Sequence, residues 1–291
     1  MDVIDFTQTV SSTSIGFMML GVIISVFAPI VLYRTVAGRF KGQILSMVLG
    51  VLGYVTIEML IVNTLVVLPF YIPGVLDFLN ARPTLFLAYQ LVLNGVLMET
   101  GRWFFVYTIY QRTPQIGDAA RMAVGYGGTE SILMVAMGMF LNITVAMAIN
   151  DQGLAVLLEG MDNQQITELM TTIKPLVDTP AAYHLITGLD GLVRILFHIA
   201  QTLILYLMVS KKGPGWLLPL AMLLRVIYLL PIGLYNQGIY SDLLLNKTLI
   251  LMVVSLTCGV CYLLYQRFAP DDLKPQEQKP RIKTMVPGGK R

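Results

Sequence analysis

The stretch VLNGVLMETGRWFFVYTIY, residues 92–110, is apolar enough to cross a membrane, yet it carries Glu99 and Arg102 near its middle. A carboxylate and a guanidinium three residues apart lie on one face of a helix, where they can neutralise each other. A buried ion pair, however, often fails to recover its desolvation cost. Charges inside a membrane span usually face the protein interior and mark a functional site. The stretch therefore predicts an all-α membrane bundle with a polar interior.

The composition of the whole chain supports a polytopic membrane protein. Of its 291 residues, 56% are hydrophobic and only 13% are charged, and the mean hydropathy is +0.71; soluble domains are far more polar. Two Cys and two His exclude a disulfide scaffold and any metal site built mainly from these residues. We expect no cofactor and no metal, because arginines beside the intramembrane carboxylates would repel a cation.

Seven apolar segments are long enough to cross the hydrocarbon core, which takes about 20 residues. They cover residues 13–33, 43–69, 84–111, 121–149, 181–209, 214–235 and 244–266. Basic residues near span ends accumulate on the cytoplasmic side, and most of the 20 Lys and Arg fall on one side of this arrangement. The N-terminus is therefore predicted outside and the C-terminus inside. Asp2 and Asp5 stand where a secretory signal has basic residues, so we expect the first span to be retained.

One transmembrane domain, residues 1–268, is predicted. Its long connection, residues 151–180, carries apolar residues at near-helical spacing, which predicts an external amphipathic cap between spans four and five. Residues 269–291 are polar, Pro-rich and basic, and predict a disordered cytoplasmic tail that anionic lipid attracts. Membrane lipids, and a membrane protein or peptide, are the expected partners; no nucleic-acid partner is expected.

Ionisable residues on four spans lie at similar predicted depths. At about 1.5 Å per helical residue, Glu99 lies about 18 Å and Glu130 about 14 Å from the cytoplasmic end of its span. The same count gives about 18 Å for His198 and about 16 Å for Arg225. Facing lipid would be costly for any of them. We therefore expect one polar chamber with Tyr126 at its cytoplasmic mouth, lined by Glu99, Arg102, Glu130, His198 and Arg225.

Glycines precede the acid of span four in VGYGGTES, residues 124–131. Gly125, Gly127 and Gly128 let a neighbouring helix, water or a substrate backbone approach closely. Both a packing role and a binding role are open for them.

Other charged residues lie nearer the outside of the predicted spans. They are Glu58 and the pair Asp190 and Arg194, which are four residues apart. A structural ion pair or a polar helix contact is the expected role of these three residues.

Four short motifs resemble elements of the YhfC-type intramembrane peptidases, relatives of the CAAX-processing and bacteriocin-immunity membrane proteases. METGR (98–102) resembles the E-x-G-R element of that family, and GYGGTES (125–131) resembles its G-H-G-G-x-E element. DGLVRILFHIAQT (190–202) resembles its acid-R…H-x-x-x-S/T segment, and RVIYL (225–229) stands in the place of a late H-x-x-x-D. The order and spacing match over most of residues 10–265.

The resemblance implies a bacterial plasma-membrane protease with a chamber that faces the cytoplasm, where a Glu activates water. If the roles known in the family are transferred residue by residue, Glu99 is the general base and Arg102 is its orienting partner. Glu130 is then a second chamber acid, and His198 is a base or an oxyanion donor. Tyr126, Arg225 and the three glycines of span four are the implied binding residues.

Departures from the family pattern keep the activity open. Tyr126 stands in place of a His, and Arg225 and Leu229 replace the late His and acid. Tyr is a poor base at neutral pH and Arg cannot act as one. One hypothesis is a catalytically inactive relative, a pseudoenzyme, whose chamber binds or regulates a membrane partner, peptide or lipid. The alternatives are an active intramembrane endopeptidase using Glu99-activated water and a transporter or channel subunit.

Overall fold

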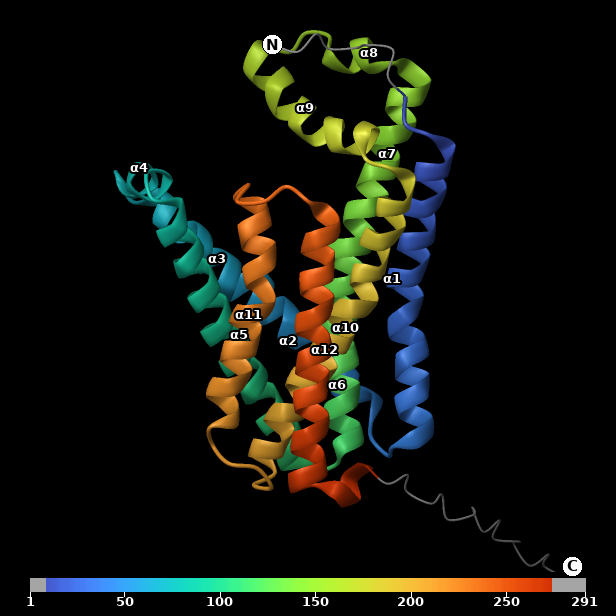
Figure 1. Ribbon diagram of the computed structural model, residues 1–291. Coiled ribbons are helices and arrows are strands. Elements are labelled where there is room, and N and C mark those ends of the chain that lie inside the picture. The colour runs from blue at the N-terminus through green and yellow to red at the C-terminus, as the bar shows by residue number, and fades with distance from the viewer. Residues whose placement is uncertain (1–8, 274–291) are drawn as a thin grey trace, which may run out of the picture.

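The structure, a computed structural model, describes residues 9–273, and within them the chain is a bundle of long helices without strands (Figure 1). The predicted all-α membrane bundle is thereby confirmed. Its elements are α1 (Ser12–Arg39), α2 (Ile44–Tyr54), η1 (Val55–Val62), α3 (Asn63–Val67), η2 (Leu68–Tyr71), α4 (Val75–Asn80), α5 (Pro83–Arg112), α6 (Ile116–Glu130), η3 (Ser131–Ala136), α7 (Met137–Gln152), α8 (Leu154–Leu158), α9 (Asn163–Asp178), α10 (Ala181–Val209), α11 (Leu217–Asn236), α12 (Leu243–Phe268) and η4 (Pro270–Leu273).

Six helical segments among the described residues are long and apolar enough to cross a membrane. They are Ser12–Arg39, Ile44–Tyr71, Ile116–Gln152, Ala181–Val209, Leu217–Asn236 and Leu243–Phe268. The predicted third span, α5, has 30 residues but is not one of the six; polar residues such as Asn94, Glu99 and Arg102 interrupt its apolar sequence. It nevertheless runs along α11 in the bundle (Figure 1). The orientation across the membrane stays a prediction.

The centre of the bundle is formed by α10 and α6. In its most apolar stretch, α10 is 61% buried, whereas the other five candidate spans are between 22% and 33% buried. Most residues of α6 are buried, and this helix packs against α1, α2 and α10. α6 ends at Glu130 and α10 begins only at Ala181. Their packing is therefore a tertiary contact, and it fixes where the polar side chains of the two helices meet.

The predicted cap corresponds to α8 and α9, which lie over one end of α7 and α1 (Figure 1). Asp162 begins α9 with a capping box: its side chain accepts from the backbone of Gln165, whose side chain accepts from Asp162 N–H. The apolar face of the cap packs on α1 and α7 in a cluster that includes Leu154, Leu158, Ile173, Leu176, Met18 and Ile149. Burial of this apolar face is what holds the cap on the bundle.

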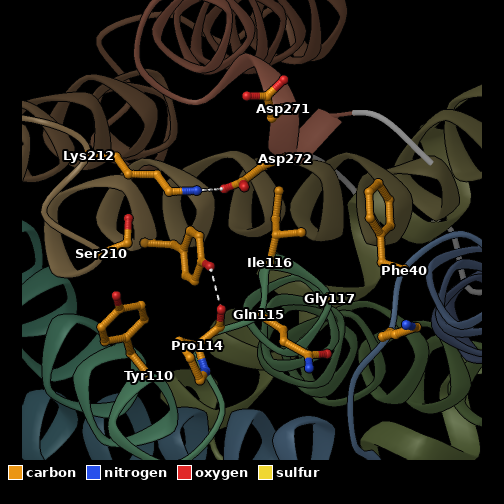
Figure 2. Close-up of a pocket in the computed structure, with 12 residues that line it drawn as sticks. Phe40, Tyr110, Pro114, Gln115, Ile116, Gly117, Ser210, Lys212, Asp271 and Asp272 are labelled. Atoms are coloured by element: carbon orange, nitrogen blue, oxygen red, sulfur yellow. Dashed lines mark hydrogen bonds and ion pairs between the residues drawn. The ribbon is translucent and has the colours of Figure 1, made fainter. Parts of the chain in front are cut away.

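The opposite end of the bundle carries the loops rich in Lys and Arg. There η4 folds back on the end of α10, where Lys212 Nζ lies 2.5 Å from Asp272 Oδ2, and Tyr206 donates a hydrogen bond of 3.4 Å to the carbonyl of Pro114 (Figure 2). The first residues of the predicted tail are thus folded. The rest of that tail, residues 274–291, lies outside the described residues.

Candidate functional site

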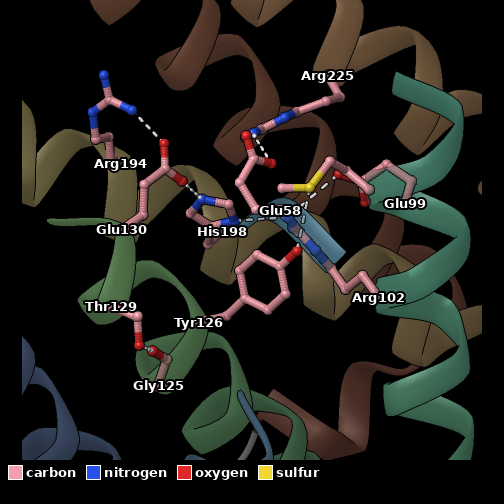
Figure 3. Close-up of polar contacts among 11 residues, drawn as sticks. Glu58, Glu99, Arg102, Gly125, Tyr126, Thr129, Glu130, Arg194, His198 and Arg225 are labelled. Atoms are coloured by element: carbon pink, nitrogen blue, oxygen red, sulfur yellow. Dashed lines mark hydrogen bonds and ion pairs between the residues drawn. The ribbon is translucent and has the colours of Figure 1, made fainter. Parts of the chain in front are cut away.

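The five residues predicted to line one chamber meet in the middle of the bundle (Figure 3). Their exposed fractions are 3% for Glu130, 1% for Arg225 and 0% for the other three. Four different helices supply them: α5, α6, α10 and α11. The meeting is therefore a property of the tertiary fold, and it is the arrangement that avoids exposing these charges to lipid.

A continuous chain of polar contacts joins four of the charged residues to His198. Arg194 Nη1 contacts Glu130 Oε1, and His198 Nε2 contacts Glu130 Oε2. Arg102 Nη2 lies 2.7 Å from His198 Nδ1 and 3.4 Å from Glu99 Oε1. Figure 3 shows Glu130 and Arg194 on one side of the imidazole and Arg102 and Glu99 on the other.

These contacts fix the protonation of the imidazole. A guanidinium can only donate, so His198 Nδ1 must accept from Arg102 and carries no proton. The proton then sits on Nε2, which donates to the carboxylate of Glu130. His198 is a neutral imidazole with both ring nitrogens engaged. Glu130 likewise has both oxygens engaged, because the second accepts from Arg194.

A second ion pair lies beside this chain. Arg225 Nη2 is 3.8 Å from Glu58 Oε2. The guanidinium of Arg225 also lies 5.8 Å and 5.6 Å from the ring centroids of Phe197 and Tyr228, within the range of a cation–π contact. Arg225 is thus held by one acid and two aromatic rings.

The charges of the whole centre balance. We call the polar centre the seven residues Glu58, Glu99, Arg102, Glu130, Arg194, His198 and Arg225. Counted as ionised groups, its three carboxylates face three guanidinium groups, and the neutral imidazole adds no charge. Balance is what a group of charges needs when several of its members are removed from water.

Two π-helical segments border the polar centre. Glu58 lies within η1, and η3 begins directly after Glu130. A π-helix carries an extra residue per turn, and such segments occur frequently at functional sites. A π-helical segment changes the direction of the side chains after it relative to those before it, so Glu58 and Glu130 point in other directions relative to the far ends of their spans than they would in a regular α-helix.

Tyr126 lies inside this cluster and is fully buried, so its predicted position at a mouth is wrong. Its ring centroid is 5.0 Å from that of His198 and 5.4 Å from that of Tyr54, and the Arg102 guanidinium carbon lies 4.7 Å above the Tyr126 ring. The phenol donates a weak hydrogen bond of 3.5 Å to the sulfur of Met98. The aromatic ring of Tyr126 therefore forms one wall of the polar centre.

The glycines of α6 lie at contacts with three neighbouring helices. An added Cβ on Gly127 would lie 2.8 Å from Ile195 Cα in α10, and one on Gly128 would lie 2.8 Å from Pro29 Cβ in α1. A Cβ on Gly125 would collide with the carbonyl of Met47 in α2. Close packing explains these glycines, and Gly127 brings α10 near enough for His198 to reach Glu130. A binding role for them stays a prediction.

Sequence reasoning missed two members of the polar centre. It paired Arg194 with Asp190, but Arg194 contacts Glu130, and Asp190 contacts Lys247 of α12. It also placed Glu58 outside the chamber. The signal available for Arg194 was its position four residues before His198, which puts both on one helix face.

Several buried polar atoms of the polar centre have no hydrogen-bond partner within the described residues. These are both carboxylate oxygens of Glu99, Oε2 of Glu58, Nε of Arg194, and the Nε and Nη1 atoms of Arg102 and Arg225. Leaving such atoms unsatisfied costs free energy. Acceptors on Glu99 and donors on the two arginines therefore offer complementary contacts to a ligand.

The donor set of the polar centre does not suit a metal ion. Among the described residues, no group of three or more His, Cys, Asp or Glu is arranged to hold one. A ligating imidazole needs a free nitrogen lone pair, and that of His198 faces Arg102. Three guanidinium groups also occupy the positions where they would repel a cation.

Comparison with known proteins gives the family. No curated protein and no solved structure matches the chain. Residues 24–250 match the model of the family described as YhfC intramembrane metalloprotease, well over half of the chain. The matched region contains every member of the polar centre. It excludes residues 12–23 of α1 and residues 251–268, which are most of α12. This chain therefore belongs to the YhfC intramembrane metalloprotease family.

Proposed function

We propose that this multi-span membrane protein is a catalytically inactive member of its family, whose polar centre binds or regulates a membrane partner, peptide or lipid. The observation that carries the proposal is the contact chain Arg194, Glu130, His198, Arg102. Amide hydrolysis needs a positioned group that can take a proton from water. Both nitrogens of His198 and both oxygens of Glu130 already have partners.

The family description names a metalloprotease, and this chain's residues do not fit that chemistry. Both nitrogens of His198 and both oxygens of Glu130 already have hydrogen-bond partners, and no third ligand joins them among the described residues. Arg225 supplies a permanent positive charge in the same space. The residues of the polar centre therefore support no metal-dependent hydrolysis step.

The unsatisfied atoms support a binding role. Glu99 offers two acceptor oxygens, while Arg102 and Arg225 offer donor N–H groups. A peptide group presents one donor and one acceptor, so a segment of a membrane peptide can pair with both kinds of atom at once. Such pairing would recover part of the free energy that the buried charges cost.

An active endopeptidase is the second candidate, and one observation favours it. Glu99 is fully buried, has neither oxygen in a hydrogen bond and lies beside Arg102. Glu99 therefore keeps the capacity to accept a proton from water, a capacity that it shares with Glu58, whose Oε2 also has no hydrogen-bond partner.

The deciding experiment incubates purified protein in lipid nanodiscs with a labelled membrane-peptide library. Cleavage products are measured by mass spectrometry, and binding is measured by photocrosslinking. The wild type is compared with Glu99→Gln and with the exposed control Glu159→Gln. We expect no cleavage by any of them and crosslinking that only Glu99→Gln reduces. Cleavage that disappears in Glu99→Gln and persists in Glu159→Gln would establish the enzyme and refute the proposal.

We further propose that the protein lies in the bacterial plasma membrane with its N-terminus outside. The support is the gathering of basic loops at one end of the bundle. Reporter fusions after Gly160 and after Lys283 should report opposite compartments. Reporters in the same compartment would contradict this orientation.

A further inference from the structure

A positively charged cleft lies at the basic end of the bundle, away from the polar centre. It has a volume of about 310 Å³ and is lined by the end of α1, the α1–α2 loop and Arg121 of α6. Arg39 and Lys41, both exposed, line it together with Arg121. Three cations thus border one small space, which favours an anion.

Arg121 is buried and only partly paired. Its exposed fraction is 4%. Nη2 donates a hydrogen bond of 3.0 Å to the carbonyl of Phe40, but Nε and Nη1 are buried without a partner. A guanidinium stays charged and can only donate, so the unpartnered N–H groups at Nε and Nη1 leave Arg121 with donors to offer to an anion such as a phosphate group.

One oxygen of the acid beside Arg121 already has partners, while its other oxygen, Asp118 Oδ2, has none among the described residues. Asp118, one turn earlier on α6, accepts hydrogen bonds of 2.7 Å from Gln43 N–H and from the Ser46 hydroxyl. These bonds fix the α1–α2 loop on α6, and they place Lys41 at the cleft. The neighbouring cleft, of about 140 Å³, differs because Asp271 and Asp272 line it (Figure 2). Phosphate chemistry therefore fits the first cleft and not the second.

A separate apolar groove lies further along α1. It has a volume of about 360 Å³ and is lined by residues of α1 from Ile23 to Leu32 together with Leu192 of α10. Val31 and Leu32 in the groove are each seven residues before Gly38 and Arg39 in the cleft. Seven residues are nearly two helical turns, so both sites lie on one face of α1, about 10 Å apart along its axis.

We propose that the charged cleft and the groove form one binding site for an anionic phospholipid. The headgroup phosphate lies between Arg121, Arg39 and Lys41, and one acyl chain follows the groove on α1. The choice of a lipid over free phosphate rests on the shared helix face: a phospholipid joins an anionic headgroup to an apolar chain, so it can occupy both sites, whereas free phosphate can occupy only the cleft. This inference is independent of the proposed function of the polar centre.

The test measures lipid binding to purified protein in detergent by native mass spectrometry. The probes are dioleoylphosphatidylglycerol, dioleoylphosphatidylcholine and, as competitor, inorganic phosphate. We expect preference for the anionic lipid. The double variant Arg39→Gln/Lys41→Gln should weaken its binding about tenfold or more, since each basic residue near an anionic headgroup contributes about 1 kcal/mol, which is about fivefold. Both side chains are exposed, so the variant is expected to fold.

A matched control removes equal charge from the same end of the bundle. Arg112→Gln/Lys211→Gln changes two exposed basic residues outside the cleft, and should alter affinity less than twofold. Ala28→Phe fills the groove and should weaken phosphatidylglycerol binding severalfold. Equal losses in the two double variants would overturn the site. If inorganic phosphate displaced the lipid completely and Ala28→Phe had no effect on binding, the lipid would be refuted as the ligand, and the cleft would be a site for a free anion.

Discussion

The polar centre and the contact of α6 with the start of α2 both bury a carboxylate, but the two carboxylates are satisfied in different ways. Asp118 of α6 accepts from the backbone N–H of Gln43, at the end of the α1–α2 loop, and from the hydroxyl of Ser46 in the first turn of α2, both neutral donors. Glu130 accepts from Arg194 and from the imidazole of His198. The difference follows from position: a loop has free backbone N–H groups, whereas in mid-helix those groups already bond to carbonyls four residues earlier.

This comparison explains why charges accumulate in the middle of the bundle. An acid there cannot be satisfied by backbone, so it needs side-chain donors from neighbouring helices, and a guanidinium donor requires a further acid in turn. The polar centre thus contains three acids and three arginines, while one Asp suffices to fix the loop. The polar centre should therefore be sensitive to loss of charge, and the loop only to loss of an acceptor.

The largest effect is expected for Arg102→Ala, which removes the partner of both Glu99 and His198. Breaking a buried ion pair from one side costs about 3–5 kcal/mol, and we expect a loss of that size in the free energy of unfolding. Denaturant titration in mild detergent measures it. Arg112→Ala, an exposed change on the same helix, should stay within about 0.5 kcal/mol. Equal losses in both variants would show that the Arg102 contacts do not stabilise the fold.

The second prediction compares the two acids directly with the same chemical change. Glu130→Gln removes the charge that Arg194 requires and should cost about 3 kcal/mol. Asp118→Asn keeps an acceptor oxygen for Gln43 and Ser46, so it should cost only about 1 kcal/mol. The same unfolding titration measures both. A larger loss for Asp118→Asn than for Glu130→Gln would contradict the distinction between the two sites.

The third prediction concerns the packing that brings His198 to Glu130. Gly127→Ala places a Cβ 2.8 Å from Ile195 Cα, a backbone atom that cannot move alone, and overpacking of this kind costs about 1–3 kcal/mol. Gly259→Ala is the control, because nothing lies within 4 Å of an added Cβ there. Ala is the better helix former by about 1 kcal/mol, so Gly259→Ala should be neutral or stabilising. Thermal unfolding of the two variants should shift in different directions.

The helices were predictable from sequence, and their contacts were predictable only in part. Apolar runs of sufficient length indicated each long helix, and the structure has them within a few residues of the expected bounds. Six of the about seven predicted spans meet the criterion of length and apolarity among the described residues. The exception, α5, is long enough but carries polar residues of the candidate site, and the seven-span arrangement stays a prediction. A helix can fulfil the length requirement and lack the apolarity when its polar face is buried in protein.

The wrong prediction of the partner of Arg194 shows that individual contacts between helices could not be predicted from the sequence. Spacing along one helix identifies neighbours at i+4, such as Asp190, but the partner chosen in the fold lies on another helix. The expectation that Glu58 lies nearer the outside took its span as regular, and the π-helix η1 departs from α-helical geometry. Inter-helix rotation and π-segments depend on tertiary packing, which no local pattern encodes.

The smallest effect is expected for Tyr126→Phe, which tests whether the phenol itself has a role at the polar centre. The hydroxyl donates only to the Met98 sulfur, a weak acceptor, at 3.5 Å. The ring contacts with His198, Tyr54 and Arg102 remain in Phe. We expect unfolding to change by less than about 0.5 kcal/mol and peptide crosslinking to stay at the wild-type level. If Tyr126→Phe abolished crosslinking while the fold persisted, the hydroxyl would contact the ligand, and the binding atoms would extend beyond Glu99, Arg102 and Arg225.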